Sequence, residues 1–171
     1  LGFDPQTGGR AFRERIGIVL QEAGFEDTFT PRELVRLHAG YYPHPRAVAD
    51  VLTLTGLDEK ADARVRTLSG GQRRRVAIAR ALVIEPTIIL ADEPTGSLDS
   101  ETGREVLLIL RRCVDERGVT VLLIEHNMPV VMSLAHRITV LDRGSILAEG
   151  TPEAIRANPA VQAAYLGTAD A

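Results

Sequence analysis

Short apolar runs alternate with amphipathic stretches along the chain, and each pattern predicts its own kind of element. Three runs rich in branched aliphatic residues predict strands, at 16–20, 87–91 and 119–124. Helical spacing covers most of 25–83, where 30–33 has the sequence of a capping box, and returns over 101–117 with Ser100 as the expected cap. Alternating runs on either side of a turn predict a hairpin, at 137–142 and 145–149, and short helices follow it.

The sequence LSGGQ at 68–72 places a serine and two glycines where a helix should begin. Ser69 is a good N-cap, because its hydroxyl can accept a hydrogen bond from a backbone N–H of the first turn. Gly70 and Gly71 lack the Cβ atoms that would keep a ligand from the backbone. The exposed N–H groups and the positive helix end then form an anion site suited to a phosphate. The alternative is an ordinary capped helix after a glycine turn.

Three adjacent arginines follow this pentapeptide, at 73–75. Neighbouring residues on a helix point in different directions, so these side chains cannot form one basic patch. Most of them are therefore expected on a solvated face of the helix.

Two acids end the second strand run. Asp92 and Glu93 follow 87–91 directly, and Pro94 ends the strand. Such a junction between a strand and its loop is where open α/β sheets bind ligands. The alternative is a pair of solvated turn acids before a proline.

The LSGGQ pentapeptide, the acid-ending strand and the polar turn 97–99 resemble, in order and spacing, the nucleotide-binding domain of ABC transporters. In that family they are the signature, Walker B and D-loop motifs. The resemblance implies an α/β fold of the P-loop NTPase type, with a mostly parallel sheet and a C-terminal antiparallel hairpin plus short helices. It implies one partial ABC ATPase domain over 1–171, in which approximately 25–83 form an inserted helical subdomain. The core lobe then comprises 1–24 and 84–171.

The resemblance also implies ATP and Mg²⁺ as cofactors and a role for each motif residue. Asp92 would hold Mg²⁺, usually through water, and Glu93 would be the catalytic base that polarises the water attacking the γ-phosphate. Gln21, after the first strand, matches the Q-loop residue that senses Mg²⁺ or the attacking water. His126, after the third strand, matches the switch histidine at the γ-phosphate. The residues expected to face nucleotide across a head-to-tail dimer are Ser69, Gly70, Gly71, Gln72 and Asp99.

The lysine content limits what the chain is expected to do alone. Lys60 is the only lysine among 20 lysine and arginine residues. A phosphate-binding loop ends in Gly-Lys-Ser or Gly-Lys-Thr, and the sequence contains neither. We therefore expect a domain that lacks its beginning and binds ATP negligibly alone. Its strand edges should be exposed, which favours poor solubility or a broad thermal transition.

Composition narrows the classes of partner. The 171 residues are 44% hydrophobic and 25% charged, an ordinary balance for a globular domain, and the net charge of −3 gives no sign of nucleic-acid binding. No apolar run approaches the roughly 20 residues needed to cross a bilayer, so membrane association is expected through a partner. The single Cys113 fits a reducing cytoplasm, and its helical spacing with Val106 and Leu110 predicts a packing role.

By resemblance, the partners are a second ATPase domain, identical or different, and transmembrane permease subunits that would hold the protein on the cytoplasmic face of the cell membrane. Two alternatives stay open. One is a soluble ABC ATPase acting on DNA or ribosomes, although such proteins usually carry coiled coils or tandem domains. The other is a non-catalytic structural remnant.

The subfamily signals differ along the chain. The segment before about Arg75 resembles drug-exporter ATPases, and the region 81–103 is similar to lipoprotein- and macrolide-type exporters. The tail beyond Leu123 resembles branched-chain amino-acid importers. Neither the substrate nor the direction of transport follows from these signals.

Overall fold

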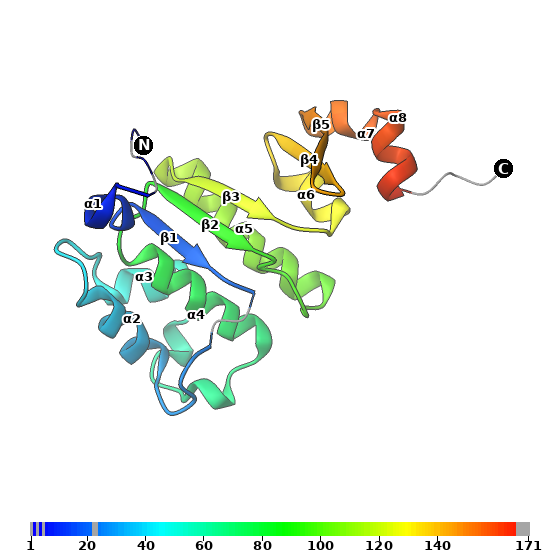
Figure 1. The fold of residues 1–171 in the computed structure, drawn as a ribbon. Helices are drawn as coiled ribbons and strands as arrows, with labels where there is room; N and C mark the ends of the chain where they lie inside the picture. Colours follow the sequence, from blue (N-terminus) through cyan, green and yellow to red (C-terminus); the bar gives the residue numbers. More distant parts are fainter. Residues whose placement is uncertain (1, 3, 5, 22–23, 167–171) are drawn as a thin grey trace. The chain divides into compact units, whose positions relative to one another are not determined.

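Three parallel strands form the sheet in the first part of the chain in this computed structural model (Figure 1). They are β1 (Ile16–Val19), β2 (Ile88–Asp92) and β3 (Thr120–Ile124), in the order β1-β2-β3. Their pairing sets Val19 opposite Ala91 and Asp92 opposite Ile124. The carboxyl ends of all three strands therefore lie at one edge of the sheet, and the expected parallel α/β fold is confirmed.

The structure describes residues 2, 4, 6–21 and 24–166. The chain divides into two compact units, Leu1–Glu125 and His126–Ala171. This boundary differs from the predicted division, which sets the helices of 25–83 apart from a core lobe of 1–24 and 84–171. In the structure these helices belong to the same unit as the sheet, because the last of them packs directly on β1.

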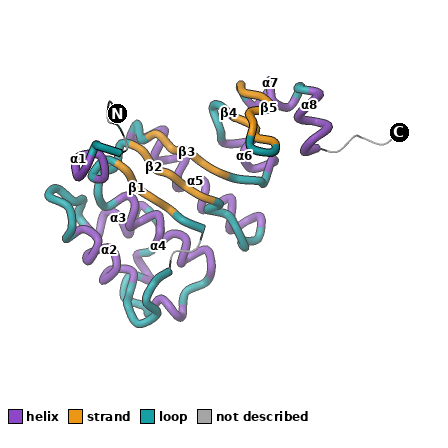
Figure 2. The backbone as a smooth tube through the Cα atoms, viewed as in Figure 1, coloured by secondary structure: helices purple, strands orange, loops and turns teal. Residues whose placement is uncertain are grey.

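Figure 2 marks the helices of the first unit, most of which lie between β1 and β2 in the sequence. They are α2 (Pro31–Ala39), α3 (Val48–Leu54) and α4 (Gly70–Leu82), with 3₁₀ turns at Asp58–Lys60 and Val65–Thr67. Helix α1 (Gly9–Arg13) precedes β1, and α5 (Ser100–Arg117) connects β2 to β3. Within the described ranges, no helix has both the length and the apolar character needed to cross a membrane.

Helices α4 and α5 pack against the sheet and against each other. On the side that they cover, the sheet residues of β1 and β2 are almost completely buried: Val19, Ile89 and Ala91. Helix α4 approaches so closely that an added Cβ on Gly17 would lie 2.7 Å from the carbonyl oxygen of Ala81. Cys113 of α5 is buried, as its spacing predicts, and this burial raises the pKa of its thiol to about 11.

The opposite face of the sheet is exposed along β1 and β3 and half-buried at Ile88 and Leu90 of β2. The side chains of Ile18, Leu122 and Ile124 are 57%, 58% and 59% exposed. The composition of the run 16–20 predicts a buried strand, and this is wrong for one of its two faces. Burial alternates along β1 because α4 and α5 lie on a single side of the sheet.

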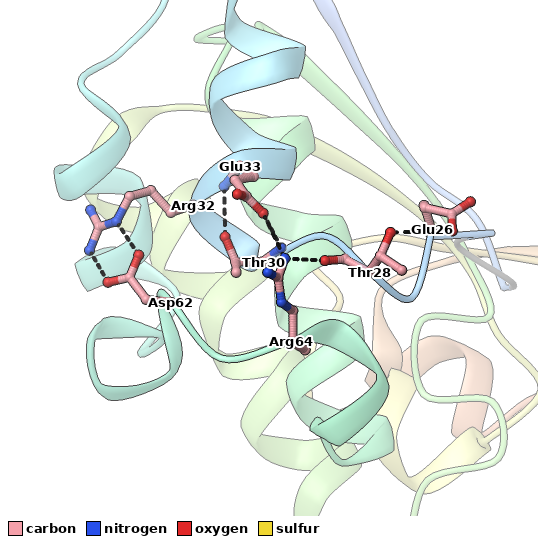
Figure 3. Close-up of polar contacts among 7 residues, drawn as sticks. All are labelled: Glu26, Thr28, Thr30, Arg32, Glu33, Asp62 and Arg64. Carbon is pink, nitrogen blue, oxygen red and sulfur yellow. Dashed lines mark hydrogen bonds and ion pairs between the residues drawn. The ribbon is translucent and has the colours of Figure 1, made fainter.

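Helix α2 begins with a complete capping box, as predicted (Figure 3). Thr30 Oγ1 accepts a hydrogen bond of 3.2 Å from the backbone N–H of Glu33, and Glu33 Oε2 accepts one of 2.8 Å from the N–H of Thr30. Arg64 Nη1 lies 3.6 Å from Glu33 Oε2 and also donates to the carbonyl oxygen of Thr28. The start of this helix is therefore satisfied within its own chain.

The second unit is built on the predicted hairpin. Its strands are β4 (Ile138–Asp142) and β5 (Ser145–Gly150), and its helices are α6 (Met128–Leu134), α7 (Pro152–Arg156) and α8 (Pro159–Val161), followed by a π-helical turn over Gln162–Leu166. The strands pair antiparallel. Arg143 and Gly144 join them with φ angles of 46° and 79°, the left-handed pair typical of a tight hairpin turn. The core of this unit consists of Ile138, Val140, Ile155 and Val161.

Candidate functional site

The carboxyl ends of β1 and β2 bring Gln21 and Glu93 together. Although 72 positions separate them in the sequence, Gln21 Nε2 donates a hydrogen bond of 2.8 Å to Glu93 Oε2. Parallel pairing of the two strands causes this meeting, since each residue lies just beyond the end of its strand. The predicted Q-loop glutamine thus contacts the predicted catalytic base.

The backbone of Glu93 adopts an uncommon conformation. Its φ of 41° lies in the left-handed region, which residues with a side chain seldom occupy. Its N–H donates to the carbonyl oxygen of Ile124 at 2.9 Å, and its carbonyl oxygen accepts from the N–H of Gly96 at 2.9 Å. Strained backbone persists only where its surroundings hold it, and it is frequent at functional sites. The direction of the Glu93 side chain is therefore set by bonds on both sides.

Asp92 is the last residue of β2 and lies exposed at the same edge of the sheet. In the part of the chain that the structure describes, no group of three His, Cys, Asp or Glu side chains could hold a metal ion. Magnesium, however, commonly binds through one or two carboxylates and completes its shell with water and substrate phosphates. Asp92 offers one carboxylate and Gln21, at the same edge, one amide oxygen, which is a small donor set of this kind. The residues fit Mg²⁺, and their role as ligands stays a prediction.

The turn after Glu93 is anchored to the end of β3. Thr95, which is 9% exposed, donates to Glu125 Oε1 through its N–H at 3.0 Å and through its hydroxyl. Among the described residues, the other carboxylate oxygen, Glu125 Oε2, is buried without a hydrogen-bond partner. Glycine is favoured at position 96, because an added Cβ would lie 3.4 Å from Gln21 Nε2 and 3.2 Å from the carbonyl oxygen of Glu93. Sequence patterns do not indicate these three supporting residues.

Helix α4 begins at the predicted place, with Ser69 as its N-cap. Ser69 Oγ accepts a hydrogen bond of 3.2 Å from the N–H of Gln72, and Gln72 Oε1 accepts one of 3.0 Å from the N–H of Ser69. The predicted cap is confirmed. Gln72 completes a capping box, so its side-chain oxygen is engaged within the chain, and its contact with nucleotide stays a prediction.

Gly70 and Gly71 have a packing role that their sequence context does not indicate. An added Cβ on Gly71 would lie 2.3 Å from Thr102 Cγ2, and one on Gly70 would lie 3.3 Å from Leu98 Cδ2. Gly71 is therefore required for α4 to pack on α5. Gly70 is exposed, so the helix end remains open to an anion at Ser69 and Gly70.

Asp99 caps α5, which corrects the expectation that Ser100 would do so. Asp99 Oδ1 accepts hydrogen bonds from the N–H groups of Glu101 at 3.1 Å and Thr102 at 2.9 Å, and Ser100 is the first residue of the helix. Hydrogen bonds from the side chain and then the backbone of Thr102 hold the pKa of the Asp99 carboxyl below its ordinary value. Contact between Asp99 and nucleotide stays a prediction.

The predicted site residues do not all belong to one unit. Those of the first unit are Gln21, Ser69, Gly70, Gly71, Gln72, Asp92, Glu93 and Asp99. His126 is the first residue of the second unit. Its role as the switch histidine therefore remains a prediction from the sequence.

The parallel sheet, the helix insertion and these residues together define the class of protein: the chain belongs to the ABC transporter family. The family described as ABC transporter matches residues 4–96, more than half of the chain. Residues 145–171 match the family described as branched-chain amino acid ATP-binding cassette transporter. This second match agrees with the resemblance of the tail to branched-chain amino-acid importers.

Particular relatives give the same assignment. The methionine import ATP-binding protein MetN of Mesorhizobium japonicum is 40% identical over 152 residues, which are 86% of this chain and 42% of that protein. MetN of Leifsonia xyli is 48% identical over 123 residues, 71% of this chain and 36% of that protein. The chain thus spans less than half the length of these curated relatives. A solved dimer of the ATP-binding cassette MJ0796, in a post-hydrolysis state bound to ADP and Pi, matches with a TM-score of 0.72 at 31% identity, covering 88% of this chain and 68% of that chain.

Proposed function

We propose that the chain is part of an ATPase subunit of an ABC transporter, which couples ATP hydrolysis to movement of a substrate through a membrane permease. The observation that carries this proposal is the 2.8 Å hydrogen bond between Gln21 Nε2 and Glu93 Oε2. It sets an amide beside a carboxylate at the edge where open α/β sheets bind their ligands. Membership of the family supports ATP and Mg²⁺ as the cofactors.

The side chains at this edge have separate roles in the proposed hydrolysis. Glu93 acts as the general base, and its carboxylate accepts the proton of the attacking water. Gln21 donates through Nε2, which leaves its amide oxygen available to orient that water or to face the cation. Asp92 holds the cation through water, and His126 contacts the γ-phosphate. When bound, Mg²⁺ would neutralise negative charge on the transferring phosphoryl group.

The start of α4 acts on a nucleotide held by a second ATPase domain. A helix terminus contributes about 0.3–1 kcal/mol to a bound charge, whereas even millimolar binding requires about 4 kcal/mol. Ser69, Gly70 and Gly71 therefore need a phosphate that another set of groups already holds. A head-to-tail dimer provides this, because the signature of each protomer then closes on the nucleotide of its partner. Asp99, at the start of α5, faces the same interface.

Permease subunits are the membrane partners in this proposal, and the protein acts at the cytoplasmic face of the membrane. The name of the curated relatives, which are import ATP-binding proteins, supports this placement. The negative net charge of −3 favours such protein partners over DNA or RNA.

An experiment that supplies a phosphate-binding loop tests the proposal. The chain is joined to the part of MetN that precedes the matched region, and ATP hydrolysis is measured with and without Mg²⁺. We expect Mg²⁺-dependent hydrolysis from the joined protein and none from the 171-residue chain alone. Glu93→Gln should lower kcat by about 10²–10⁴-fold, the usual contribution of a general base, while ATP binding is retained.

A matched control is Glu116→Gln, which removes an exposed acid in α5 that pairs with Arg112 at 3.9 Å. This variant should hydrolyse ATP at the parental rate. Equal activity of the Glu93→Gln and Glu116→Gln proteins would contradict the proposed role of Glu93. Hydrolysis by the chain alone would contradict the requirement for a phosphate-binding loop.

A further inference from the structure

One of the three adjacent arginines of α4 is buried, which corrects the expectation of a solvated face for that residue. Arg74 is only 8% exposed, whereas Arg73 is exposed and donates to the carbonyl oxygen of Arg66 at 3.3 Å. Arg75 pairs with Glu105 at 2.7 Å. Of these three adjacent arginines, only Arg74 is buried, and its hydrogen-bond partners differ from those of Arg73 and Arg75.

The guanidinium of Arg74 joins two segments that end at the candidate site. Its Nη1 donates to the carbonyl oxygen of Leu20 at 2.6 Å, and its Nη2 donates to the carbonyl oxygen of Gly96 at 3.4 Å. Leu20 immediately precedes Gln21, and Gly96 lies three residues after Glu93. One side chain therefore contacts the backbone on both sides of the Gln21–Glu93 hydrogen bond.

The charges around Arg74 fit this bridging role. Burial lowers the pKa of the guanidinium, and the nearby carboxylate of Glu125 opposes that shift. The same Glu125 accepts hydrogen bonds from Thr95, which precedes Gly96 in the turn. Arg74 and Glu125 thus hold this turn from two elements, α4 and the end of β3. Neither hydrogen bond of Arg74 involves a carboxylate, so its positive charge is directed at carbonyl oxygens.

We propose that Arg74 is a positioning residue for the hydrolytic pair: by holding the carbonyl groups of Leu20 and Gly96, it sets the geometry at which Gln21 meets Glu93. The planar guanidinium is suited to this, because it presents several donors in a fixed fork, whereas a lysine ammonium offers a single point charge. The consequence for catalysis rests on the proposed function, but the effect on the Gln21–Glu93 contact does not.

The position of Arg74 in the chain gives the proposal a second consequence. Arg74 lies five residues after Ser69, in the helix whose start is proposed to face the nucleotide of the partner. A shift of α4 on closure of the dimer would therefore act on the Leu20 and Gly96 carbonyls of the same protomer. Arg74 physically joins the signature of one site to the hydrolytic pair of the other.

The test observes the Gln21 side chain directly. The 171-residue chain is labelled with ¹⁵N, and the side-chain amide signals of Gln21 are identified by their loss in Gln21→Glu. In Arg74→Met, which keeps an apolar stem but removes all donors, these signals should move to the position and exchange rate of a free glutamine amide. Arg74→Lys should give an intermediate shift, since one ammonium can hold one carbonyl in place of two. Arg73→Met is the matched control and should leave the signals unchanged.

Circular dichroism and the thermal midpoint show whether each variant is folded, and Arg74→Lys serves where Arg74→Met does not fold. Unchanged Gln21 signals in a folded Arg74 variant would overturn the proposal, as would equal shifts in Arg73→Met. In the joined protein, Arg74→Lys should lower kcat by about 10- to 100-fold, the cost of a misplacement of about 1 Å, with the KM for ATP retained.

The two readouts separate the failure of this inference from the failure of the proposed function. Shifted Gln21 signals in the 171-residue chain, together with a joined protein that hydrolyses no ATP, support the positioning role and contradict the ATPase proposal. Rapid hydrolysis together with unmoved Gln21 signals in Arg74→Lys contradicts the positioning role alone.

Discussion

Helices α2 and α4 both begin with a capping box, but the surroundings of the two helix starts differ. Each has a hydroxyl residue as N-cap and a reciprocal bond to the third helical residue: Thr30 with Glu33, and Ser69 with Gln72. They differ in the charge of that third residue and in the first helical residue after the cap, which is Pro31 in α2 and Gly70 in α4. Because of these differences, the start of α2 is closed by its own chain and the start of α4 is open.

The start of α2 is closed. Thr30 is 7% exposed and Pro31 is buried, and the Glu33 carboxylate lies against the first turn (Figure 3). A carboxylate there compensates the positive end of the helix. The hydrogen bond from the backbone of Thr30 holds the pKa of Glu33 below its ordinary value. With Arg64 beside it, this helix start has no need of an outside anion.

The start of α4 is open. Gln72 completes the box without adding charge, and the first turn of this helix contains no acidic residue. Ser69 and Gly70 are both exposed. The positive end is therefore uncompensated by its own first turn, which is the condition under which a helix start binds a phosphate. The capping box alone does not distinguish the two helix starts; the charge at the third helical residue and the exposure of the first do.

The largest loss of stability is expected at the start of α4, where a glycine packs against α5. Gly71→Ala places a Cβ 2.3 Å from Thr102 Cγ2, so we expect it to lower the free energy of unfolding by about 1–3 kcal/mol, as overpacking usually does. Adding Thr102→Ser removes that methyl group but keeps the hydroxyl that bonds Asp99, and it should restore most of the loss. Urea denaturation of the single and double variants measures both values.

Gly70→Ala is the matched control, because its added Cβ meets only the end of the Leu98 side chain at 3.3 Å. Its effect should be clearly smaller than that of Gly71→Ala. An equal loss for both glycines, or no recovery in the double variant, would show that contact with α5 is not what requires glycine at position 71.

Local signals made much of this fold and site predictable from the sequence. The capping box at Thr30, the N-cap at Ser69 and the Arg143-Gly144 hairpin turn are each defined by neighbouring residues, and the structure confirms them. The parallel sheet followed from the resemblance to a known family rather than from any single run. Given that sheet, the placement of Gln21 and Glu93 at strand ends accounts for their meeting.

Features that depend on distant packing were not predictable. Three adjacent arginines point in three directions around a helix. Arg74 is the one that is buried because α4 lies against Leu20 and Gly96. The apolar run at 16–20 has the composition of a strand buried on both faces, although helices cover only one. The shift of the α5 cap from Ser100 to Asp99 shows how two adjacent cap-forming residues leave the helix start ambiguous by one position.

A smaller loss of stability is expected when either N-cap is removed, and it should differ between the two helices. Thr30→Ala and Ser69→Ala each remove the hydroxyl that accepts from the third residue, which typically costs about 0.5–2 kcal/mol. We expect the larger loss for Thr30→Ala, because Thr30 is 7% exposed whereas Ser69 is exposed, so the first change also removes buried side-chain atoms. Thr30→Ser keeps the cap and is the control. A larger loss for Ser69→Ala would mean that exposure does not distinguish the two starts.

The smallest change in stability is expected from exchanging the charge of the third helical residue, which is Glu33 in α2 and Gln72 in α4. Because the folded pKa of Glu33 lies below the ordinary glutamate value of 4.5, ionised Glu33 stabilises the native state above that value. This stabilisation is lost as the pH falls through the lowered folded pKa. Glu33→Gln should therefore flatten the fall in unfolding free energy between neutral pH and the acid range, and Gln72→Glu should steepen it. Denaturation curves at neutral pH and below the ordinary glutamate value measure the change. If neither variant alters the pH profile, the charge at the third position is not what closes α2 and leaves α4 open, and exposure of the first turn would have to carry the distinction alone.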